Sequence, residues 1–219
     1  MMTPVLAVVA AYLIGSIPFG FLLVKWKTGA DVRAAGSGNI GATNVLRTTG
    51  RAAGIATLLL DIAKGYCAVW LAAYLTENKI EWMSAAAIAV MAGHAFPVFL
   101  RFHGGKAVAS FVGAFLYLTP LALAAVTIVF FAAVAYSRYI SLGSILGAGT
   151  FPLAVWLIEK PPLAVVAAAC VSGGFIIYRH RENIARIRAG TEHLFSFSAK
   201  RRQQHPDEDA AGDWRMRRL

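Results

Sequence analysis

The sequence predicts an all-α, polytopic integral membrane protein with about seven transmembrane helices, and three observations support this. The chain of 219 residues is 58% hydrophobic, with a mean hydropathy of +0.61. Only 15% of its residues are charged, against roughly 25% in a typical soluble domain. Several uncharged runs also approach or exceed the about 20 residues that a helix needs to cross a bilayer. A disordered chain and an ordinary water-soluble globule are both excluded by this composition.

The apolar runs follow one another along the chain with polar loops between them. The first run, 5–24, contains no Asp, Glu, Lys or Arg, and the second, 52–76, contains only Asp61 and Lys64. These two side chains are three positions apart on one helix face, so we expect them to form an ion pair that holds helices together. The remaining uncharged runs are 82–100, 107–137, 139–158 and 161–178.

The run 107–137 is too long for one crossing. As a single helix its 31 residues would measure about 46 Å, compared with about 30 Å for the hydrocarbon core of a bilayer. Pro120 lies inside the run, and the residue before a proline resists the α conformation. We therefore expect two helices, 107–119 and 121–137, which makes seven in all. A re-entrant hairpin over the same residues is an alternative with the same overall topology.

The distribution of Lys and Arg tests this count, because cytoplasmic loops carry an excess of basic residues. With seven helices and residues 25–51 in the cytoplasm, the basic residues divide 12 to 2 between inner and outer loops, whereas six helices would divide them 8 to 6. The sequence therefore predicts that the N-terminus lies outside and the C-terminus lies in the cytoplasm. The inner group comprises Lys25, Lys27, Arg33, Arg47, Arg51, Arg101, Lys106, Arg138, Arg179, Arg181, Arg186 and Arg188, and the outer group Lys79 and Lys160.

The chain divides into one transmembrane domain, 1–197, and a charged cytoplasmic tail, 198–219, that we expect to be disordered. The net charge of +10 does not indicate nucleic-acid binding, because the basic residues lie between apolar runs rather than along one face. Membrane lipid and small anions are the expected partners of these residues instead.

The first polar segment on the predicted cytoplasmic side is Gly36-Ser-Gly-Asn-Ile-Gly-Ala-Thr-Asn-Val-Leu-Arg47. Its glycines form a backbone that can turn several N–H groups toward one anion, and its arginine adds planar donors suited to phosphate. A dinucleotide fingerprint and a Walker A loop are excluded, because no strand precedes the segment and Ala42 stands where the Walker lysine belongs. We interpret the segment as a phosphate site rather than a merely flexible loop. The candidate ligands are Ser37, Gly38, Asn39, Gly41, Thr43, Asn44, Arg47 and, just beyond the segment, Arg51.

The second polar segment, 93–106, ends in Gly104, Gly105 and Lys106 at the predicted start of a helix. A cation at a helix N-terminus is unfavourable against the helix dipole unless an anion is present. Lys106 is therefore predicted to bind an anion together with the two glycines. His94, earlier in the segment, is expected to be structural and bonded to backbone or to a neighbouring helix.

The third polar segment, 179–192, follows the last apolar run. His180 and Asn183 are three positions apart on one helix face at the membrane edge, and with Glu192 they are candidate site residues. For Arg186 and Arg188 the alternative is a basic flank that only sets topology. A fourth, short segment at 141–144 contributes Ser144.

Three motifs, in this order along the chain, carry a resemblance to a known family. They are Ser37-Gly-Asn-Ile-Gly-Ala-Thr-Asn-Val-Leu-Arg47, Gly93-His-x-Phe-Pro-Val-Phe with Phe102-x-Gly-Gly-Lys106, and His180-Arg-x-Asn-Ile-x-Arg186 with Gly190-x-Glu192. Over about residues 5–195 they resemble the bacterial acyl-phosphate:glycerol-3-phosphate acyltransferases, the PlsY family. That family usually reads Gly-Gly-Lys-Gly-Val-Ala-Thr in the second motif, so Ala107 and Ser110 are departures, and Ala in place of Gly removes backbone freedom.

The resemblance implies transfer of a fatty acyl group from acyl phosphate to the 1-hydroxyl of sn-glycerol 3-phosphate, which gives lysophosphatidic acid and phosphate. It implies Lys106, Arg47, His180 and Ser144 as catalytic residues and the other candidates as substrate-binding residues. It also implies a site at the cytoplasmic face of the inner membrane and a functional link to an enzyme that produces acyl phosphate. Neither a cofactor nor a metal ion is expected, because acyl phosphate is already activated and positioning with charge neutralisation can supply the catalysis.

The proton acceptor and the class of activity each have alternatives. The sequence has no His-x4-Asp pair and no Gly-x-Ser-x-Gly elbow. We therefore expect a substrate phosphate oxygen to accept the hydroxyl proton while His180 orients the glycerol, with His180 as general base the alternative. The competing classes are a transporter for a phosphorylated solute, which would place polar groups at the midplane, and a transferase that uses a lipid-linked phosphate donor.

Overall fold

The computed structural model describes residues 2–195, and every regular element in that range is helical. The longer helices are α1 (Met2–Ser16), α4 (Arg51–Leu75), α5 (Ile80–Ala95), α7 (Pro120–Ser137), α8 (Ile140–Ala154) and α9 (Leu163–Arg179). The shorter helices are α2 (Phe19–Thr28), α3 (Ala42–Thr49), α6 (Val108–Leu118) and α10 (Arg181–Arg188). Two 3-10 turns, η1 (Val32–Ala34) and η2 (Val98–Leu100), and a π-helical turn, η3 (Val155–Glu159), complete the fold. The predicted tail lies outside the described residues.

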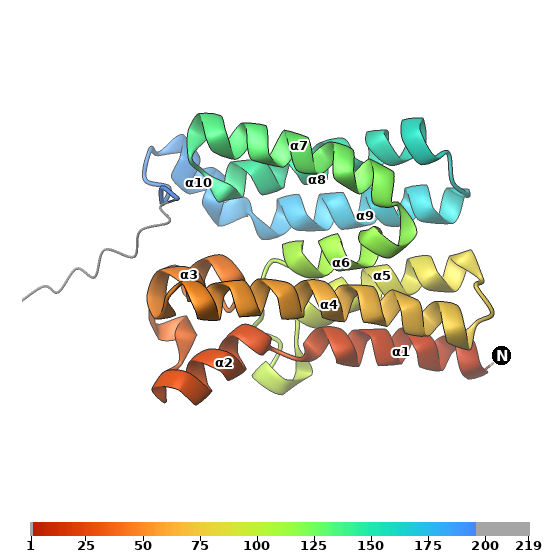
Figure 1. Ribbon diagram of the computed structural model, residues 1–219, viewed down its shortest axis with the longest axis horizontal. Coiled ribbons are helices and arrows are strands. Elements are labelled where there is room, and N and C mark those ends of the chain that lie inside the picture. Colours follow the sequence, from red (N-terminus) through yellow and green to blue (C-terminus); the bar gives the residue numbers. More distant parts are fainter. Residues whose placement is uncertain (1, 196–219) are drawn as a thin grey trace, which may run out of the picture.

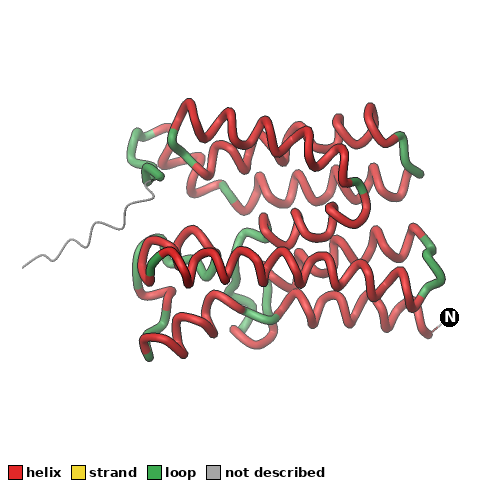
Figure 2. Tube along the Cα trace, in the orientation of Figure 1, coloured by secondary structure: helices red, strands yellow, loops and turns green. Residues whose placement is uncertain are grey.

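The helices form two groups with α6 between them (Figure 1). One group contains α1, α4 and α5, and the other contains α7, α8 and α9. The short helices α3 and α10 and the loops beside them gather at the end of the molecule opposite the N-terminus, as Figures 1 and 2 show. Two of the predicted polar segments, far apart in sequence, thus meet at one end of the bundle.

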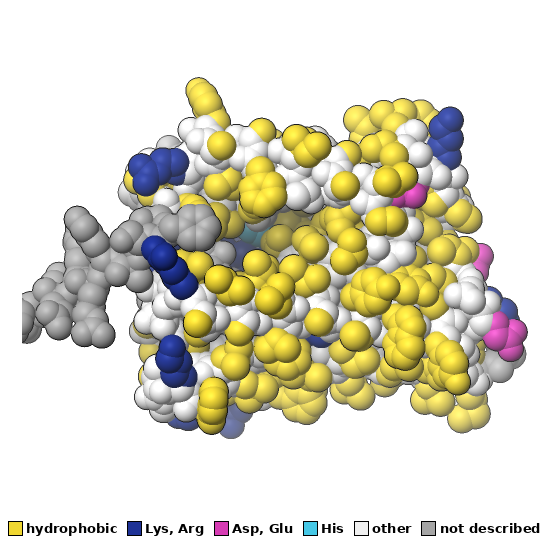
Figure 3. Space-filling view, viewed as in Figure 1, with side chains coloured by type: hydrophobic (Ala, Val, Ile, Leu, Met, Phe, Trp, Pro, Cys, Tyr) yellow, Lys and Arg dark blue, Asp and Glu magenta, His cyan; other side chains and the backbone are white. Residues whose placement is uncertain are grey.

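Within residues 2–195, five segments are long and apolar enough to cross a membrane. They are Met2–Thr28, Arg51–Leu75, Ile80–Leu100, Pro120–Ser137 and Ile140–Glu159; α9 and α10, bent by 53°, make a sixth if the pair is one span. α6, with 11 residues, is shorter. Hydrophobic side chains cover most of the face in Figure 3, and almost all visible Lys and Arg lie toward its two ends. An all-helical fold with apolar spans is confirmed, whereas seven crossings and the outside location of the N-terminus stay predictions.

The long apolar run is divided where the sequence predicts. α6 ends at Leu118 and α7 begins at Pro120, because the fixed φ of proline suits the first position of a helix and not its interior. Glu159 then caps the new helix: its Oε1 accepts from the N–H groups of Leu121 at 2.8 Å and Ala122 at 3.2 Å.

The first apolar run contains a break that its composition does not indicate. α1 ends at Ser16 and α2 begins at Phe19, because Pro18 has no N–H to continue the helix. The carbonyl oxygen of Ile17 accepts from Lys64 Nζ at 2.9 Å, and Lys64 also lies 2.7 Å from Asp61 Oδ1. The predicted ion pair is confirmed, and it also satisfies the backbone at the break.

Close packing around α6 fixes the helix that follows the second polar segment. The rings of Phe111, Phe115 and Phe151 pack against one another with centroids 4.7 to 4.9 Å apart. A Cβ added at Gly113 would lie 1.9 Å from the carbonyl oxygen of Ile62 on α4, so glycine permits the two helices to touch. The start of α6 is therefore held rigidly beside α4.

Candidate active site

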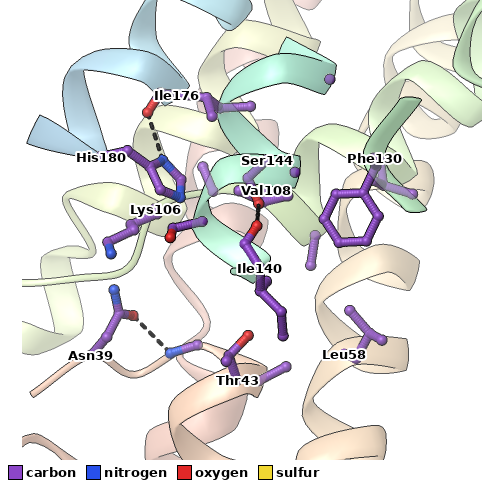
Figure 4. A pocket seen from close by; sticks show the side chains of 18 of the residues that line it. Asn39, Thr43, Leu58, Lys106, Val108, Phe130, Ile140, Ser144, Ile176 and His180 are labelled. Carbon is purple, nitrogen blue, oxygen red and sulfur yellow. Dashed lines mark hydrogen bonds between the residues drawn. The ribbon is translucent and has the colours of Figure 1, made fainter. Parts of the chain in front are cut away.

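A cavity of about 510 Å³ lies between the two helix groups. It corresponds to the hollow in Figure 3 and is enlarged in Figure 4. Its polar lining comes from α3, the start of α6, the start of α8 and the segment around α10, and its apolar lining comes from α4, α6, α7, α8 and α9. One cavity therefore joins two chemically different compartments.

The first polar loop is held in shape by Asn44, which is buried on α3. Its Oδ1 accepts from the N–H of Ser37 at 2.8 Å, and its Nδ2 donates to three carbonyl oxygens of the loop at 2.8 to 3.2 Å. Those carbonyl oxygens belong to Val32, Ala35 and Asn39. Asn39 Oδ1 in turn accepts from the N–H of Gly41 at 2.8 Å, the lower dashed line in Figure 4. The side-chain amide of Asn44 is thus engaged in organising the loop around the cavity.

The second polar segment lies against α5. The N–H groups of Gly104 and Gly105 donate to α5 carbonyl oxygens at 3.1 Å, so they do not face the cavity as predicted phosphate ligands would. Their own carbonyl oxygens accept from the Arg179 guanidinium, with 2.9 Å from Nη2 to the Gly105 oxygen. This support leaves the next residue, Lys106, as the group that reaches the cavity.

Ala107, which precedes α6, has a φ of +62° in the left-handed region. This conformation costs an L-residue with a Cβ about 1–2 kcal/mol. It is the position at which the family that the motifs resemble usually has glycine. The backbone therefore keeps a conformation that suits glycine although the side chain has changed.

Lys106 belongs to a hydrogen-bonded network that joins three segments. Its Nζ donates to Asn183 Oδ1, and Asn183 Nδ2 donates to Glu192 Oε1 at 2.7 Å. Glu192 also accepts from Arg186 Nε at 2.7 Å and from Ser141 Oγ at 2.9 Å. The network fixes the polar end of the cavity between the start of α6, the start of α8 and α10.

The electrostatics of this network favour an added anion. Burial and, as a smaller effect, the nearby charge of Arg186 lower the pKa of Lys106 to about 8. Burial acts to raise the pKa of Glu192, but hydrogen bonds from Asn183, Arg186 and Ser141 outweigh it and hold that pKa below its usual value. An anion placed beside Lys106 would stabilise the ammonium form and raise its pKa again.

His180 is buried where α9 meets α10. Its Nδ1 lies 2.8 Å from the carbonyl oxygen of Ile176, and because a carbonyl only accepts, Nδ1 carries the proton and Nε2 the lone pair. Burial and the nearby charge of Lys106 lower the pKa of His180 to about 4, so the ring is neutral at physiological pH. Figure 4 shows the ring beside Lys106 at the cavity. It is suited to accept a hydrogen bond and is a weak base.

Most of the predicted site residues are brought together. Ser144 lines the cavity, and its hydroxyl donates to the carbonyl oxygen of Ile140 at 3.0 Å. The predicted residues that line the cavity are Ser37, Asn39, Gly41, Thr43, Asn44, Arg47, Lys106, Ser144, His180, Asn183 and Glu192. Those that the structure does not bring to its lining are Gly38, Arg51, Gly104 and Gly105.

Three residues outside the predicted set also line the polar end, namely Ser141, Arg186 and His193, and the buried side chains of Asp61 on α4 and His94 on α5 belong to the cavity lining as well. Arg186 pairs with Glu192, so a basic flank alone does not account for it; its signal in the sequence is its place at the end of the motif His180-Arg-x-Asn-Ile-x-Arg186. Ser141 had no signal, because a lone serine after an apolar run looks like any other helix start.

The apolar lobe of the cavity resembles a site for a hydrocarbon chain. Ile55 and Leu58 of α4 border it and are 50% and 42% exposed, so the lobe reaches the outer surface of the bundle. Its other apolar lining residues include Val108, Val112, Leu123, Val126, Phe130 and Phe131. A mostly apolar pocket with a few convergent polar groups is typical of a ligand site.

Comparison with known proteins agrees with this geometry. Residues 5–190 match a family model described as glycerol-3-phosphate acyltransferase. The chain is similar to the glycerol-3-phosphate acyltransferase of Geobacter metallireducens, with 50% identity over 196 residues that cover 89% of this chain and 99% of the relative. It is also similar to that of Geotalea daltonii, with 44% identity over 195 residues and the same two coverages.

The fold is similar to that of a solved relative. A crystal structure of PlsY, an integral membrane glycerol 3-phosphate acyltransferase, in its glycerol 3-phosphate form matches with a TM-score of 0.83 and 37% identity over 88% of this chain and 96% of that chain. The lysophosphatidic acid form matches with a TM-score of 0.80 and 36% identity over 89% and 96%. Because the family model spans most of the sequence and the relatives are similar over nearly their whole length, the chain belongs to the glycerol-3-phosphate acyltransferase family.

Proposed function

We propose that this chain transfers a fatty acyl group from acyl phosphate to the 1-hydroxyl of sn-glycerol 3-phosphate and releases lysophosphatidic acid and phosphate. The observation that carries the proposal is one cavity with a cationic polar end and an apolar lobe. A phosphorylated polyol fits the first compartment, and an acyl chain fits the second. Family membership supports the acceptor, and the resemblance of the three motifs supports acyl phosphate as the donor.

The polar end is suited to bind phosphate groups. Arg47, Lys106 and Arg186 all line it, and the pKa of Lys106 is about 8 without an anion. Below that pH the ammonium is present and attracts a phosphate dianion. Above that pH, Lys106 must take up a proton before it can pair with phosphate. The affinity for phosphate therefore falls about tenfold per pH unit.

The reaction needs little acid–base chemistry from the protein. The glycerol oxygen attacks the acyl carbonyl carbon, the bond from that carbon to the phosphate oxygen breaks, and phosphate leaves with the electron pair. A substrate phosphate oxygen accepts the hydroxyl proton. Arg47 and Lys106 neutralise the charge that develops on the leaving phosphate and the carbonyl oxygen, while His180 Nε2 accepts a hydrogen bond and orients the hydroxyl. Ser144, whose proton is directed to its own helix, takes part as a polar contact rather than as a nucleophile.

The proposed location follows from the same cavity. Acyl phosphate is amphiphilic, so its chain enters the apolar lobe from the inner leaflet while its phosphate reaches the polar end. We place that end at the cytoplasmic face of the inner membrane, where an enzyme that makes acyl phosphate supplies the donor and water-soluble glycerol 3-phosphate arrives from the cytoplasm.

The test uses the purified full-length protein in detergent with radiolabelled glycerol 3-phosphate. We expect equal amounts of lysophosphatidic acid and phosphate with palmitoyl phosphate, and no product with palmitoyl-CoA, which has the same chain and a thioester in place of the anhydride. Transfer from the thioester alone would overturn the donor. In proteoliposomes, uptake of labelled glycerol 3-phosphate without any donor would instead indicate the transporter.

A further inference from the structure

Three ionisable side chains are buried beside the cavity, two of which, Asp61 and His94, are part of its lining, and the proposed reaction does not use them. Asp61 and Lys64 lie on α4 and His94 lies on α5, and they are 2%, 4% and 4% exposed. Lys64 Nζ is held between Asp61 Oδ1 at 2.7 Å and the carbonyl oxygen of Ile17 at 2.9 Å. Charged groups within membrane helices are expensive to bury and usually serve a function.

His94 connects this ion pair to the segment that carries Lys106. Its Nδ1 lies 3.6 Å from Asp61 Oδ1, so the expected contact with a neighbouring helix is present, although Nδ1 has no hydrogen-bond partner among the described residues. The other side of the ring touches Gly105: a Cβ added there would lie 2.1 Å from His94 Nε2. The ring is thus held by packing between a carboxylate and a glycine.

The Gly104–Gly105 backbone is supported on two sides. On one side Gly105 donates to the carbonyl oxygen of His94 at 3.1 Å and lies against its ring. On the other, the Arg179 guanidinium donates to the Gly105 carbonyl oxygen at 2.9 Å. Lys106 follows at once, so a shift of the His94 ring moves the backbone from which the ammonium reaches the cavity.

We propose that Asp61, Lys64 and His94 form a positioning cluster for Lys106, and this rests on the anion-binding role proposed for that lysine. Lys64, anchored on the Ile17 carbonyl, fixes the Asp61 carboxylate; the carboxylate and α5 fix the His94 ring; and the ring sets the position of Gly105. Productive geometry is sensitive to displacements of about 1 Å, which can cost about 100-fold in rate. In this proposal the three residues act through Gly105 and Lys106 and take no direct part in the acyl transfer.

The first test is a suppressor experiment on the contact between Gly105 and His94. Gly105→Ala places a methyl group against the imidazole, and we expect kcat/KM to fall at least tenfold. His94→Ala removes the ring that the methyl group meets, so Gly105→Ala should lower kcat/KM by a much smaller factor in the His94→Ala background than in the wild type. Gly174→Ala is the matched control, because a Cβ there meets nothing within 4 Å; it should leave activity unchanged with or without His94→Ala. If Gly105→Ala lowered kcat/KM by the same factor in both backgrounds, the proposal would be overturned.

The second test separates positioning from stability through the pH profile. When His94→Ala releases Lys106 from its buried place, the alkaline limb of glycerol 3-phosphate binding should move upward from near pH 8 and kcat should fall at least tenfold. If the cluster were merely structural, His94→Ala would lower the melting temperature and the folded fraction. The protein that remained folded would keep its kcat and the pH of its alkaline limb. The charged or titratable groups facing Lys106 that must be left intact are Arg179, His180, Glu182, Arg186 and Glu192.

Two further measurements keep the outcome decisive. If His94→Ala does not fold, His94→Asn and the nearly isosteric Asp61→Asn are measured by the same profile, and an unmoved limb in both with unchanged kcat would refute the positioning role. The wild-type protein is assayed with palmitoyl phosphate in the same preparation. An inactive wild type would refute the proposed function, whereas an active wild type with unaltered variants would refute the cluster alone.

Discussion

Lys106 and Arg47 are expected to bind anions rather than to set topology. Lys106→Ala should lower kcat/KM with palmitoyl phosphate by a factor that corresponds to about 2–5 kcal/mol, the effect of removing one partner of a desolvated charge pair. Arg47→Ala should fall near the lower end of that range, because the side chain lines the cavity but stays more exposed. Both values come from initial rates at pH 7 with purified variants of matched folded fraction.

Arg188 provides the control for this prediction. It lies on α10 close in sequence to the site, is exposed and is not among the cavity residues. Arg188→Ala should cost less than about 1 kcal/mol, as exposed charges do. Similar losses at all three positions would mean that the basic residues act only through the overall charge of this end of the molecule.

His180 is expected to orient the glycerol hydroxyl and not to act as general base. Because the pKa of His180 is lowered to about 4, its ionisation lies below the range in which most rates are measured. An acidic limb near pH 6 in kcat/KM then belongs to the second ionisation of the substrate phosphate, which has a pKa of about 6. In His180→Asn, which keeps a hydrogen-bond acceptor, that limb should persist while the KM for glycerol 3-phosphate rises.

The opposite result has a clear form. A general base contributes about 10²–10⁴-fold and imposes its own pKa on the profile. If His180→Asn abolishes the acidic limb and lowers kcat by that factor at an unchanged KM, the proton goes to histidine and not to a phosphate oxygen. In that case His180 Nε2 accepts the proton of the glycerol hydroxyl during the attack.

The residues that could be identified from the sequence are those whose type or spacing is unusual for the segment in which they lie. Lys106 stands against a helix dipole, and His180 and Asn183 share one face of a helix at a membrane edge. Ser141, at a helix start, and Arg179, at the end of an apolar run, are ordinary residue types at their positions. Their roles, a hydrogen bond to Glu192 and a clamp on the glycine carbonyls, come from contacts 51 and 74 residues apart in sequence, which no local pattern records.

At the scale of one element, the start of α6 carries strain that can be measured. Ala107 has a φ of +62°, so Ala107→Gly removes the clash of Cβ with the backbone and should stabilise the protein by about 1 kcal/mol. Relief of this strain should appear as a higher melting temperature in the same detergent. Activity should be retained, since the conformation of the neighbouring Lys106 does not change.

Ala109→Gly is the matched control two residues further on. It makes the same chemical change inside the first turn of α6, where glycine lowers stability by roughly 0.5–1 kcal/mol relative to alanine. The two substitutions should therefore shift the melting temperature in opposite directions. A decrease for both would show that residue 107 does not hold the left-handed conformation.

The helix breaks show how far an element can be predicted. Pro120 divides a run that is already too long for one crossing, so length and proline agree. Pro18 lies in a run of ordinary length, and its break is stabilised by Lys64 from another helix. Nothing in the first run itself indicates that partner, and the short helix α3 likewise forms within a segment that the sequence marks only as a polar loop.

At the scale of the whole molecule, the arrangement brings a water-soluble and a lipid-soluble reactant to one cavity. The polar groups of α3 and α10 lie at the end opposite the N-terminus (Figure 1), and the apolar lobe lies between the helix groups. The composition predicts both parts separately. Their junction depends on α6 filling the space between the groups, which only the packing of its phenylalanines explains.

This arrangement requires the loop between α4 and α5 and the loops near the site to lie on opposite sides of the membrane. The excess of basic residues near the site assigns that side to the cytoplasm. In a background of Cys67→Ala and Cys170→Ala, Lys79→Cys should react with an impermeant maleimide on intact cells. Ala35→Cys and Thr191→Cys, both exposed positions, should react only after permeabilisation.

The labelling pattern separates two errors. If Lys79→Cys and Thr191→Cys react from the same side, the two ends of the bundle do not face opposite compartments and the arrangement of the helices is wrong. If the pattern is complete but reversed, the helices are correctly arranged and the charge rule has assigned the wrong face. A reversed pattern would place the polar end of the cavity outside the cell, away from cytoplasmic glycerol 3-phosphate. The proposed reaction therefore requires the predicted orientation of the bundle as well as the anion-binding role of Lys106.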